Sequence, residues 1–190
     1  MSERLIADGW IVDGWSRGKE LPKSQWDLLL CCIGTLLPVG PFFDGSMEDW
    51  NDGLYANAVL PLELLHKLYR QRSNNALVVF FAGPNPNRPQ PGYSAYDVAK
   101  IVLIRMVENL NSESPDLRFV AIGPGFMRSK MTAHIPPRVE TNPDDLYELL
   151  KVCLKSTKQQ LGRNVHIRDS WRSGLQWTEP SDCLKLRRMG

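Results

Sequence analysis

Three short apolar runs, each followed by a chain-breaking residue, limit most strongly how this chain of 190 residues can fold. The runs are DLLLCCI, ALVVFFA and LRFVAIG, at residues 27–33, 76–82 and 117–123. Glycine closes the first two runs and Pro-Gly follows the third. Continuous apolar runs are typical of strands that are buried on both faces, as in a parallel sheet. The first run also fits a short buried helix, although its length and the glycine that follows it favour a strand.

Helical periodicity appears between and after these runs. The expected helices are residues 54–72, 94–111 and 144–161. The first carries an apolar stripe, and Pro61 within it is expected to kink the helix or mark an offset. Ser94 is expected to be the N-cap of the second helix, with Asp97 in the N3 position of a capping box.

Two shorter apolar stretches, at residues 10–12 and 164–168, are expected to be further strands, and residues 126–143 a loop. Strands that alternate with helices imply parallel crossover connections. We therefore predict an α/β fold, with a Rossmann-like, mostly parallel sheet flanked by helices. The whole chain, residues 1–190, is expected to form a single domain of this kind.

Bulk composition excludes several classes of function. Hydrophobic content of 43% and a net charge of +2 are ordinary for a globular protein and give no reason to expect a nucleic acid partner. No apolar run reaches membrane-spanning length and no signal peptide opens the chain, so we expect a cytoplasmic protein without a membrane partner. Cys31 and Cys32 are expected to be reduced core thiols. The three histidines have no ligand spacing, so no metal site is expected.

The stretch GYSAYDVAK, at residues 92–100, contains the candidate chemistry. Tyr96 and Lys100 are four residues apart, so on a helix they share one face. An ammonium beside a phenol favours the phenolate, and such a pair can donate or accept a proton at a carbonyl or an alcohol. An ordinary surface pair at the start of a helix is the other interpretation.

Together, the order of elements and these motifs resemble the short-chain dehydrogenase/reductase family over roughly residues 10–171. The run that ends at Gly34 is similar to the fourth strand of that family, and Asn57 aligns with its relay asparagine. Tyr96 and Lys100 align with its catalytic tyrosine and lysine. The segments at 122–125 and 129–132 resemble the stretch that edges the nicotinamide and opens the substrate lid.

The resemblance implies an oxidoreductase that transfers a hydride between NAD(P)(H) and a small alcohol or carbonyl substrate. Tyr96 would protonate the carbonyl oxygen, Lys100 would hold the ribose and lower the pKa of the tyrosine, and Asn57 would position a relay water. The implied cofactor-binding residues are Ser16, Arg17, Gly34, Lys100, Pro124 and Gly125. Ser16 and Arg17 would suit a 2′-phosphate and so favour NADP over NAD.

The resemblance also implies a lid and an assembly. Within the expected lid, Met127, Met131 and Ile135 are apolar enough either to touch a substrate or to pack on the core. Helices 54–72 and 94–111 would form the interface of a homodimer or homotetramer.

Two departures separate this chain from the family pattern. Gly83 stands thirteen residues before Tyr96, where the family has its catalytic serine, and Asn85 is either a replacement donor or part of an Asx turn. The residues before Trp10 contain no Gly-rich turn for a pyrophosphate and no first strand. Asp8-Gly9 then resembles the end of the helix after that turn, and WIVDGWSR the second strand.

Three interpretations stay open on the sequence. The chain is a working oxidoreductase, or it is a catalytically impaired relative that was kept as a structural or assembly partner. In the third, the Gly-rich turn is encoded upstream of Met1.

Overall fold

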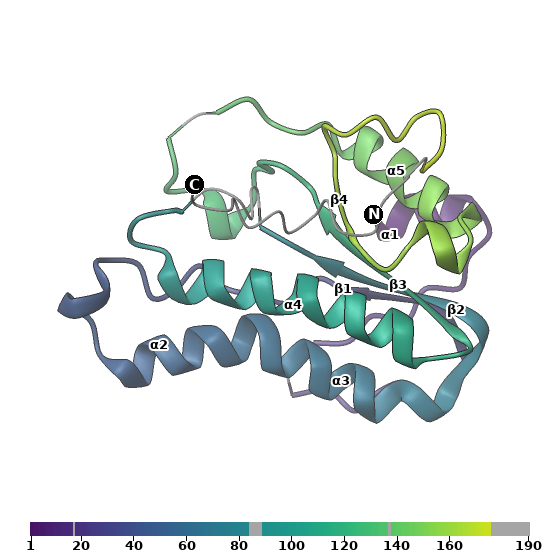
Figure 1. The fold of residues 1–190 in the computed structure, drawn as a ribbon, viewed down its shortest axis with the longest axis horizontal. Coiled ribbons are helices and arrows are strands. Elements are labelled where there is room, and N and C mark those ends of the chain that lie inside the picture. Colours follow the sequence, from purple (N-terminus) through teal and green to yellow (C-terminus); the bar gives the residue numbers. More distant parts are fainter. Residues whose placement is uncertain (17, 84–88, 137, 176–190) are drawn as a thin grey trace, which may run out of the picture.

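A four-stranded parallel sheet forms the centre of the computed structural model, which describes residues 1–16, 18–83, 89–136 and 138–175 (Figure 1). All neighbouring strands pair in parallel and follow the chain order. The strands are β1 (Trp26–Cys31), β2 (Arg72–Phe81), β3 (Leu117–Gly123) and β4 (Asn164–His166). The predicted α/β fold with a Rossmann-like parallel sheet is therefore confirmed.

Helices cover both faces of the sheet (Figure 1). One face carries α2 (Met47–Leu54), the π-helical turn η2 (Tyr55–Val59), α3 (Leu60–Leu68) and α4 (Ser94–Glu113). The other face carries α1 (Ser2–Ala7) and α5 (Pro143–Lys155). Single 3-10 turns are η1 (Phe42–Asp44), η3 (Tyr69–Gln71), η4 (Lys130–Thr132) and η5 (Lys158–Gln160).

The two faces of the central strand β2 explain why its sequence is continuously apolar. Leu77 and Val79 belong to the core cluster that includes α1 and α5, whereas Val78 and Phe80 belong to the cluster that includes α3 and α4. Successive side chains of a strand point to opposite faces. All four side chains are fully buried, so this strand has no solvated face that would favour polar residues.

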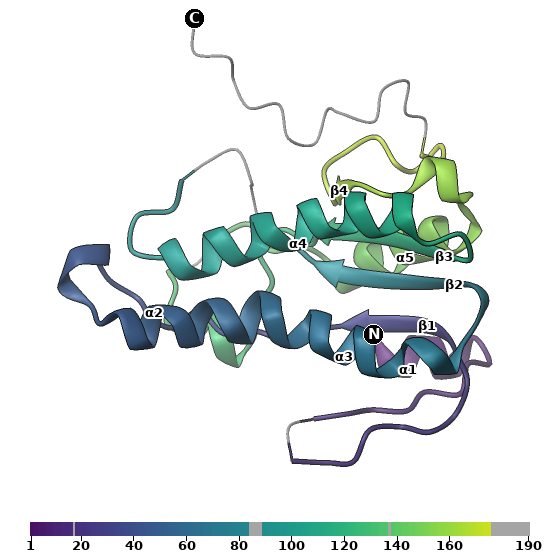
Figure 2. The ribbon, with the colours of Figure 1, turned by 60° about the horizontal axis from the view of Figure 1, so that its bottom comes forward.

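The expected strand at residues 10–12 is wrong. These residues belong to the segment between α1 and β1, which runs beside the β1 edge of the sheet (Figure 2). Trp10 packs against the core, but Ile11 is 99% exposed. The backbone of the segment forms no ladder with β1 or with any other described strand, and side chains of the segment and of β1 line a pocket together instead. The predicted helix end at Asp8-Gly9 is confirmed, because α1 ends at Ala7 and Gly9 adopts a φ of +87°.

The expected helix at residues 54–72 begins earlier and ends earlier. It starts at Met47, where the Ser46 side chain accepts a hydrogen bond from the Asp49 amide at 3.0 Å. Its turns continue through η2 into α3, and the chain enters β2 at Arg72. Pro61 lies in the first turn of α3, directly after the π-helical turn, so the expected distortion takes the form of a wider turn.

The predicted cap at Ser94 is also wrong. Tyr93 occupies the N-cap position of α4, and Ser94 is the first helical residue. The Ser94 hydroxyl instead accepts a hydrogen bond from the Trp50 indole of α2 at 3.0 Å. Asp97 accepts hydrogen bonds from the backbone and side chain of Gln90 at 2.9 and 3.0 Å. Contacts between elements thus replace the expected local capping box.

Within the described part of the chain, no helix combines the length and apolar character needed to cross a bilayer.

Candidate active site

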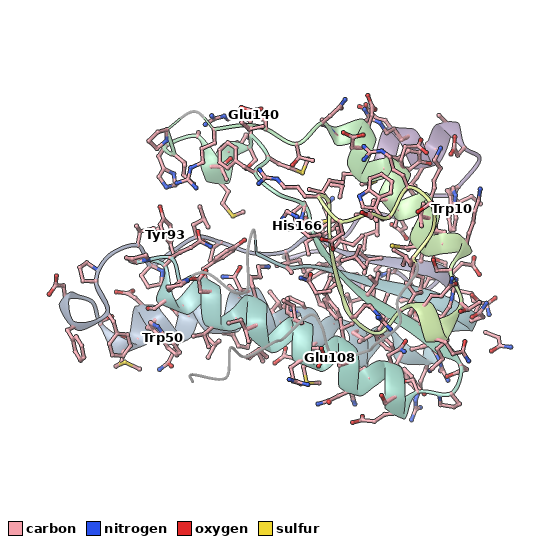
Figure 3. All side chains as sticks on the ribbon, turned by 45° about the horizontal axis from the view of Figure 1, so that its top comes forward. Trp10, Trp50, Tyr93, Glu108, Glu140 and His166 are labelled. Atoms are coloured by element: carbon pink, nitrogen blue, oxygen red, sulfur yellow. The ribbon has the colours of Figure 1, made fainter. Side chains whose placement is uncertain are left out.

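A pocket of about 600 Å³ opens at the carboxyl ends of β1, β2 and β3. Ligands of open parallel sheets bind at this edge of the strands. Tyr93, just before α4, and Glu140, on the loop that leads to α5, lie on opposite sides of this end of the sheet (Figure 3). The pocket lining includes six residues that the sequence singled out: Gly34, Asn57, Tyr96, Lys100, Pro124 and Gly125.

Other predicted site residues lie elsewhere or cannot be located. Ser16 is exposed on the segment between α1 and β1, outside the residues that line the pocket. Arg17 and Asn85 fall outside the described residues. Their suggested contacts with a cofactor phosphate and a substrate oxygen remain predictions.

Tyr96 and Lys100 lie one turn apart on α4, and both reach the pocket. The Lys100 Nζ atom is 5.4 Å from the centre of the Tyr96 ring. Only 7% of Lys100 is exposed. Neither the phenol nor the amine forms a hydrogen bond or an ion pair with any residue that the structure describes. A buried amine without a partner is costly, so this side chain is available to a ligand.

Burial controls the protonation of the pair. It lowers the pKa of Lys100 to about 8, although the nearby thiols of Cys31 and Cys32 partly offset the effect. It raises the pKa of Tyr96 to about 12, with a further contribution from Asp97. The expectation that Lys100 lowers the pKa of Tyr96 is therefore wrong for the ligand-free protein. Desolvation of the phenolate outweighs the attraction of an amine that is itself desolvated.

Asn57 connects the end of β1 to the helices. It is fully buried in the π-helical turn. Its side-chain amide donates to the carbonyls of Thr35 and Gly53 at 2.9 and 2.8 Å, and its carbonyl oxygen accepts from the Thr35 amide at 3.0 Å. These bonds hold the loop after β1 against the floor of the pocket. The backbone carbonyl of Asn57 cannot accept the usual helical hydrogen bond from the residue four positions later, because that residue is Pro61, which has no N–H.

Gly34 is required by this contact. A Cβ atom at Gly34 would lie 2.5 Å from the Asn57 Oδ1 atom and 3.7 Å from the Lys100 Nζ atom. The first distance is too short for any side chain, so only glycine lets the loop approach Asn57 this closely. The loop backbone is thereby kept within reach of Lys100.

Gly83 is the position where the sequence lacks the expected serine. It is buried at the end of β2, beside Tyr96 and Lys100. A Cβ atom at this position would lie 3.6 Å from both side chains, which is an ordinary van der Waals distance. The missing hydroxyl is therefore not explained by lack of space.

A lid loop, residues 126–136 and 138–141, covers one side of the pocket. Its base is closed by a hydrogen bond of 2.8 Å from the Thr141 amide to the Phe126 carbonyl. Gly125 precedes it with a φ of +72°, and a Cβ atom there would lie 2.4 Å from the Thr141 hydroxyl. The three apolar lid residues that the sequence suggested as substrate contacts all line the pocket: Met127, Met131 and Ile135.

Arg128 fixes the shape of the lid loop, and sequence reasoning missed it. Its guanidinium donates to the carbonyls of Thr132 and Ile135 at 3.2 and 3.0 Å, and to Glu140 at 3.1 Å. It also lies 5.0 Å from the centre of the Phe126 ring. One side chain thus joins both limbs of the loop. Its role had no local sequence signal, because its partners lie up to twelve residues away.

The two neighbouring thiols differ in exposure. Cys31 is buried, which raises its pKa to about 12, so it is a neutral core thiol as expected. Cys32 is exposed and lines the pocket, so its assignment to the core is wrong. Strand β1 ends at Cys31, and the next side chain points away from the core. The described residues contain no group of three or more histidine, cysteine or acidic side chains suited to a metal ion.

Comparisons with solved structures assign the fold. A short-chain dehydrogenase from Salmonella enterica serovar Typhi superposes with a TM-score of 0.67, over 76% of this chain and 63% of its own, at 21% identity. The chain has the short-chain dehydrogenase/reductase fold. A putative short-chain dehydrogenase from Escherichia coli, solved in complex with NADPH, gives a TM-score of 0.67 over 87% of this chain and 67% of its own, at 20% identity.

Comparisons of sequence are consistent with this fold. No family model matches the chain. An uncharacterized oxidoreductase of Schizosaccharomyces pombe is 26% identical over 113 residues, which are 59% of this chain and 46% of that protein. The chain therefore spans about half the length of the curated relative that it matches. The resemblance to the short-chain dehydrogenase/reductase family, first indicated by the motifs, is confirmed.

We predict that Lys100→Met stabilises the fold at neutral pH, because it removes a buried amine that has no described partner. The pKa of Lys100 is about 8 in the folded protein and 10.5 in its ordinary state. Below pH 8 the Lys100 amine is protonated in both states. The folded protein binds this proton less tightly than the unfolded chain does, so the proton destabilises the fold. The resulting destabilisation is about 3 kcal/mol and disappears as the pH rises to about 10.5.

Urea unfolding across this pH range measures the effect. The stability difference between Lys100→Met and the wild type should shrink as the pH rises from about 8 to about 10.5. Lys67→Met is the control, because the Lys67 side chain is 59% exposed. A Lys100→Met variant that is less stable than the wild type at pH 7 would contradict the prediction.

Proposed function

We propose that the chain is an oxidoreductase that transfers a hydride between NAD(P)(H) and a carbonyl or alcohol substrate. The observation that carries the proposal is that the Tyr96 phenol and the Lys100 amine lie together at an apolar pocket on the carboxyl edge of the sheet. Neither group has a hydrogen-bond or ion-pair partner among the described residues. The Schizosaccharomyces pombe relative, whose name describes an oxidoreductase, supports it further.

The pocket fits the nicotinamide half of the cofactor. The backbone of Gly34 and of Pro124-Gly125 lines the pocket, where it can approach the nicotinamide closely. Lys100 supplies donors for the ribose hydroxyls. The described residues supply no Gly-rich turn for the pyrophosphate. When bound, the cofactor supplies or accepts a hydride at its nicotinamide ring. NADP is the favoured form, as in the solved relatives that contain NADP or NADPH.

The protonation states support carbonyl reduction as the working direction. Because the pKa of Tyr96 is raised to about 12, the phenol keeps its proton at neutral pH and can donate it to a carbonyl oxygen. Alcohol oxidation needs the phenolate, which burial disfavours. Lys100, with a pKa of about 8, can orient the ribose and return a proton towards the phenol.

Asn57 and the lid loop position the reacting groups. The side chain of Asn57 is fully used in holding the loop after β1, so we assign the relay water to its backbone carbonyl, which Pro61 cannot satisfy. The lid loop, fixed by Arg128, excludes water from one side of the substrate.

A second candidate function is assembly without catalysis. Gly83 favours it, and so does a row of apolar side chains that remain exposed on the helices: Tyr55, Val59, Val98, Ile101 and Val102. We propose that this face forms a homodimer or homotetramer interface in either case. The two functions are separated by turnover, because an assembly partner needs no proton donor at Tyr96.

We predict that Tyr96→Phe abolishes carbonyl reduction. Loss of a general acid lowers rates by roughly 10²–10⁴-fold, and the phenylalanine fills the same space without a hydroxyl. Loss of NADPH absorbance is followed at saturating NADPH with a panel of aldehydes and ketones. Tyr69→Phe, which removes an exposed hydroxyl outside the pocket, is the matched control and should keep full activity. An unchanged rate in Tyr96→Phe would remove this residue from the mechanism.

We predict that Gly83→Ser raises the turnover number. The added Cβ atom meets its neighbours at 3.6 Å, and the hydroxyl would supply a second donor beside Tyr96. A hydrogen-bond donor to a developing oxyanion accelerates reactions by roughly 10²–10³-fold, so even a poorly aligned one should give about tenfold. Gly83→Ala adds the same Cβ atom without a hydroxyl and should give no gain. Equal rates for the serine and alanine variants would show that no substrate oxygen lies within reach of this position.

A further inference from the structure

The charged side chains that line the pocket all have the same sign. Among the described lining residues, four are basic, namely Lys100, Arg128, Lys130 and Arg138, and none is acidic. The whole chain has nearly equal numbers of each kind, 23 lysines and arginines against 21 aspartates and glutamates. The overall composition therefore does not explain a lining that is basic throughout.

Two of these cations already have a role inside the protein. Arg128 forms an ion pair with Glu140 and hydrogen bonds with lid carbonyls. Lys100 is buried on α4, one turn from Tyr96. The proposed function assigns Lys100 to the cofactor ribose.

Lys130 and Arg138 have no such role. Lys130 lies in η4 and Arg138 on the returning limb of the lid loop, so they approach the pocket from two parts of the same lid. Neither forms a hydrogen bond or an ion pair with any residue in the described ranges. Both are exposed, so their charges can reach a ligand at the pocket rim without a large desolvation penalty.

The rest of the pocket lining is mostly apolar. It includes side chains from the end of β1, the end of β2, the lid loop and α5: Ile33, Phe81, Met127, Ile135 and Leu146. A ligand that reaches from the rim to the phenol therefore has an apolar body. Its end at the rim faces two cations and no described carboxylate.

We propose that Lys130 and Arg138 bind the anionic end of the substrate, and that the substrate is a ketone or aldehyde with an apolar body and a carboxylate or similar anion. This assignment rests on the proposed function, because it uses Tyr96 to mark the reacting carbonyl. The same two cations suit a cofactor phosphate, so the experiment must separate the two sources of negative charge.

Binding of two matched ketones tests the proposal without any need for turnover. Isothermal titration calorimetry compares 4-acetylbenzoate with its neutral methyl ester. The wild type should bind the acid more tightly, and Lys130→Gln/Arg138→Gln should weaken the acid roughly fivefold, as expected for two exposed ion pairs. Binding of the ester should stay unchanged. High salt should also reduce the preference of the wild type for the acid.

A second double variant controls for the change in net charge. Lys67→Gln/Arg105→Gln removes two exposed cations from α3 and α4, outside the pocket lining, and should leave binding of the acid unchanged. Equal affinities of the wild type for acid and ester would overturn the proposal. A Lys130→Gln/Arg138→Gln variant that binds the acid normally but NADPH weakly would also overturn it, because the cations would then serve the cofactor.

These experiments distinguish failure of the anion site from failure of the proposed hydride transfer. If no ketone is reduced but the acid binds through Lys130 and Arg138, hydride transfer fails while the anion site stands. If reduction depends on Tyr96 but acid and ester bind equally, hydride transfer stands and the anion site fails.

Discussion

The burial of one amine that has no partner among the described residues is the constraint on which the site depends. Lys100 is 7% exposed, and its pKa is lowered to about 8 because the apolar surroundings disfavour the ammonium. A fold selected for stability alone would pair this group or replace it with an apolar side chain. Its position beside Tyr96 in a pocket is the reason we propose that a ligand binds here.

The neighbouring contacts make this burial possible. Asn57 uses its whole side chain to hold the loop after β1, and Gly34 lets that loop approach to a distance that no other residue permits. Across the pocket, Gly125 and Arg128 close the lid loop on itself. The pocket is therefore bounded by loops at three strand ends, with Tyr96, the proposed proton donor, on α4.

Sequence reasoning found the parts of the site that lie on regular elements. The spacing of Tyr96 and Lys100 is a helical repeat, and the runs around β1, β2 and β3 are buried on both faces, so periodicity and composition identify them. It failed where long-range contacts override local signals. Ser94 has the chemistry of a cap but bonds to Trp50 on another helix. Residues 10–12 have strand composition but form no ladder with any described strand, and Arg128 acts through partners that no local motif marks.

The sequence also failed to predict the direction in which the pKa of Tyr96 is shifted. A cation next to a phenol suggested a lowered pKa for Tyr96, but the sequence does not report how deeply each group is buried. In the structure desolvation dominates both groups, which makes Tyr96 a better acid than base at neutral pH. The proposed direction of reaction, carbonyl reduction, follows from that reversal.

The titration of Lys100 itself is the most direct measurement. Nuclear magnetic resonance of lysine side chains labelled at the carbon next to the amine, with the Lys100→Met variant to assign the signal, gives its pKa. The account predicts a midpoint near 8 in the free protein. A midpoint near the ordinary lysine value of 10.5 would show that the amine is solvated or paired, and would contradict its burial without a described partner.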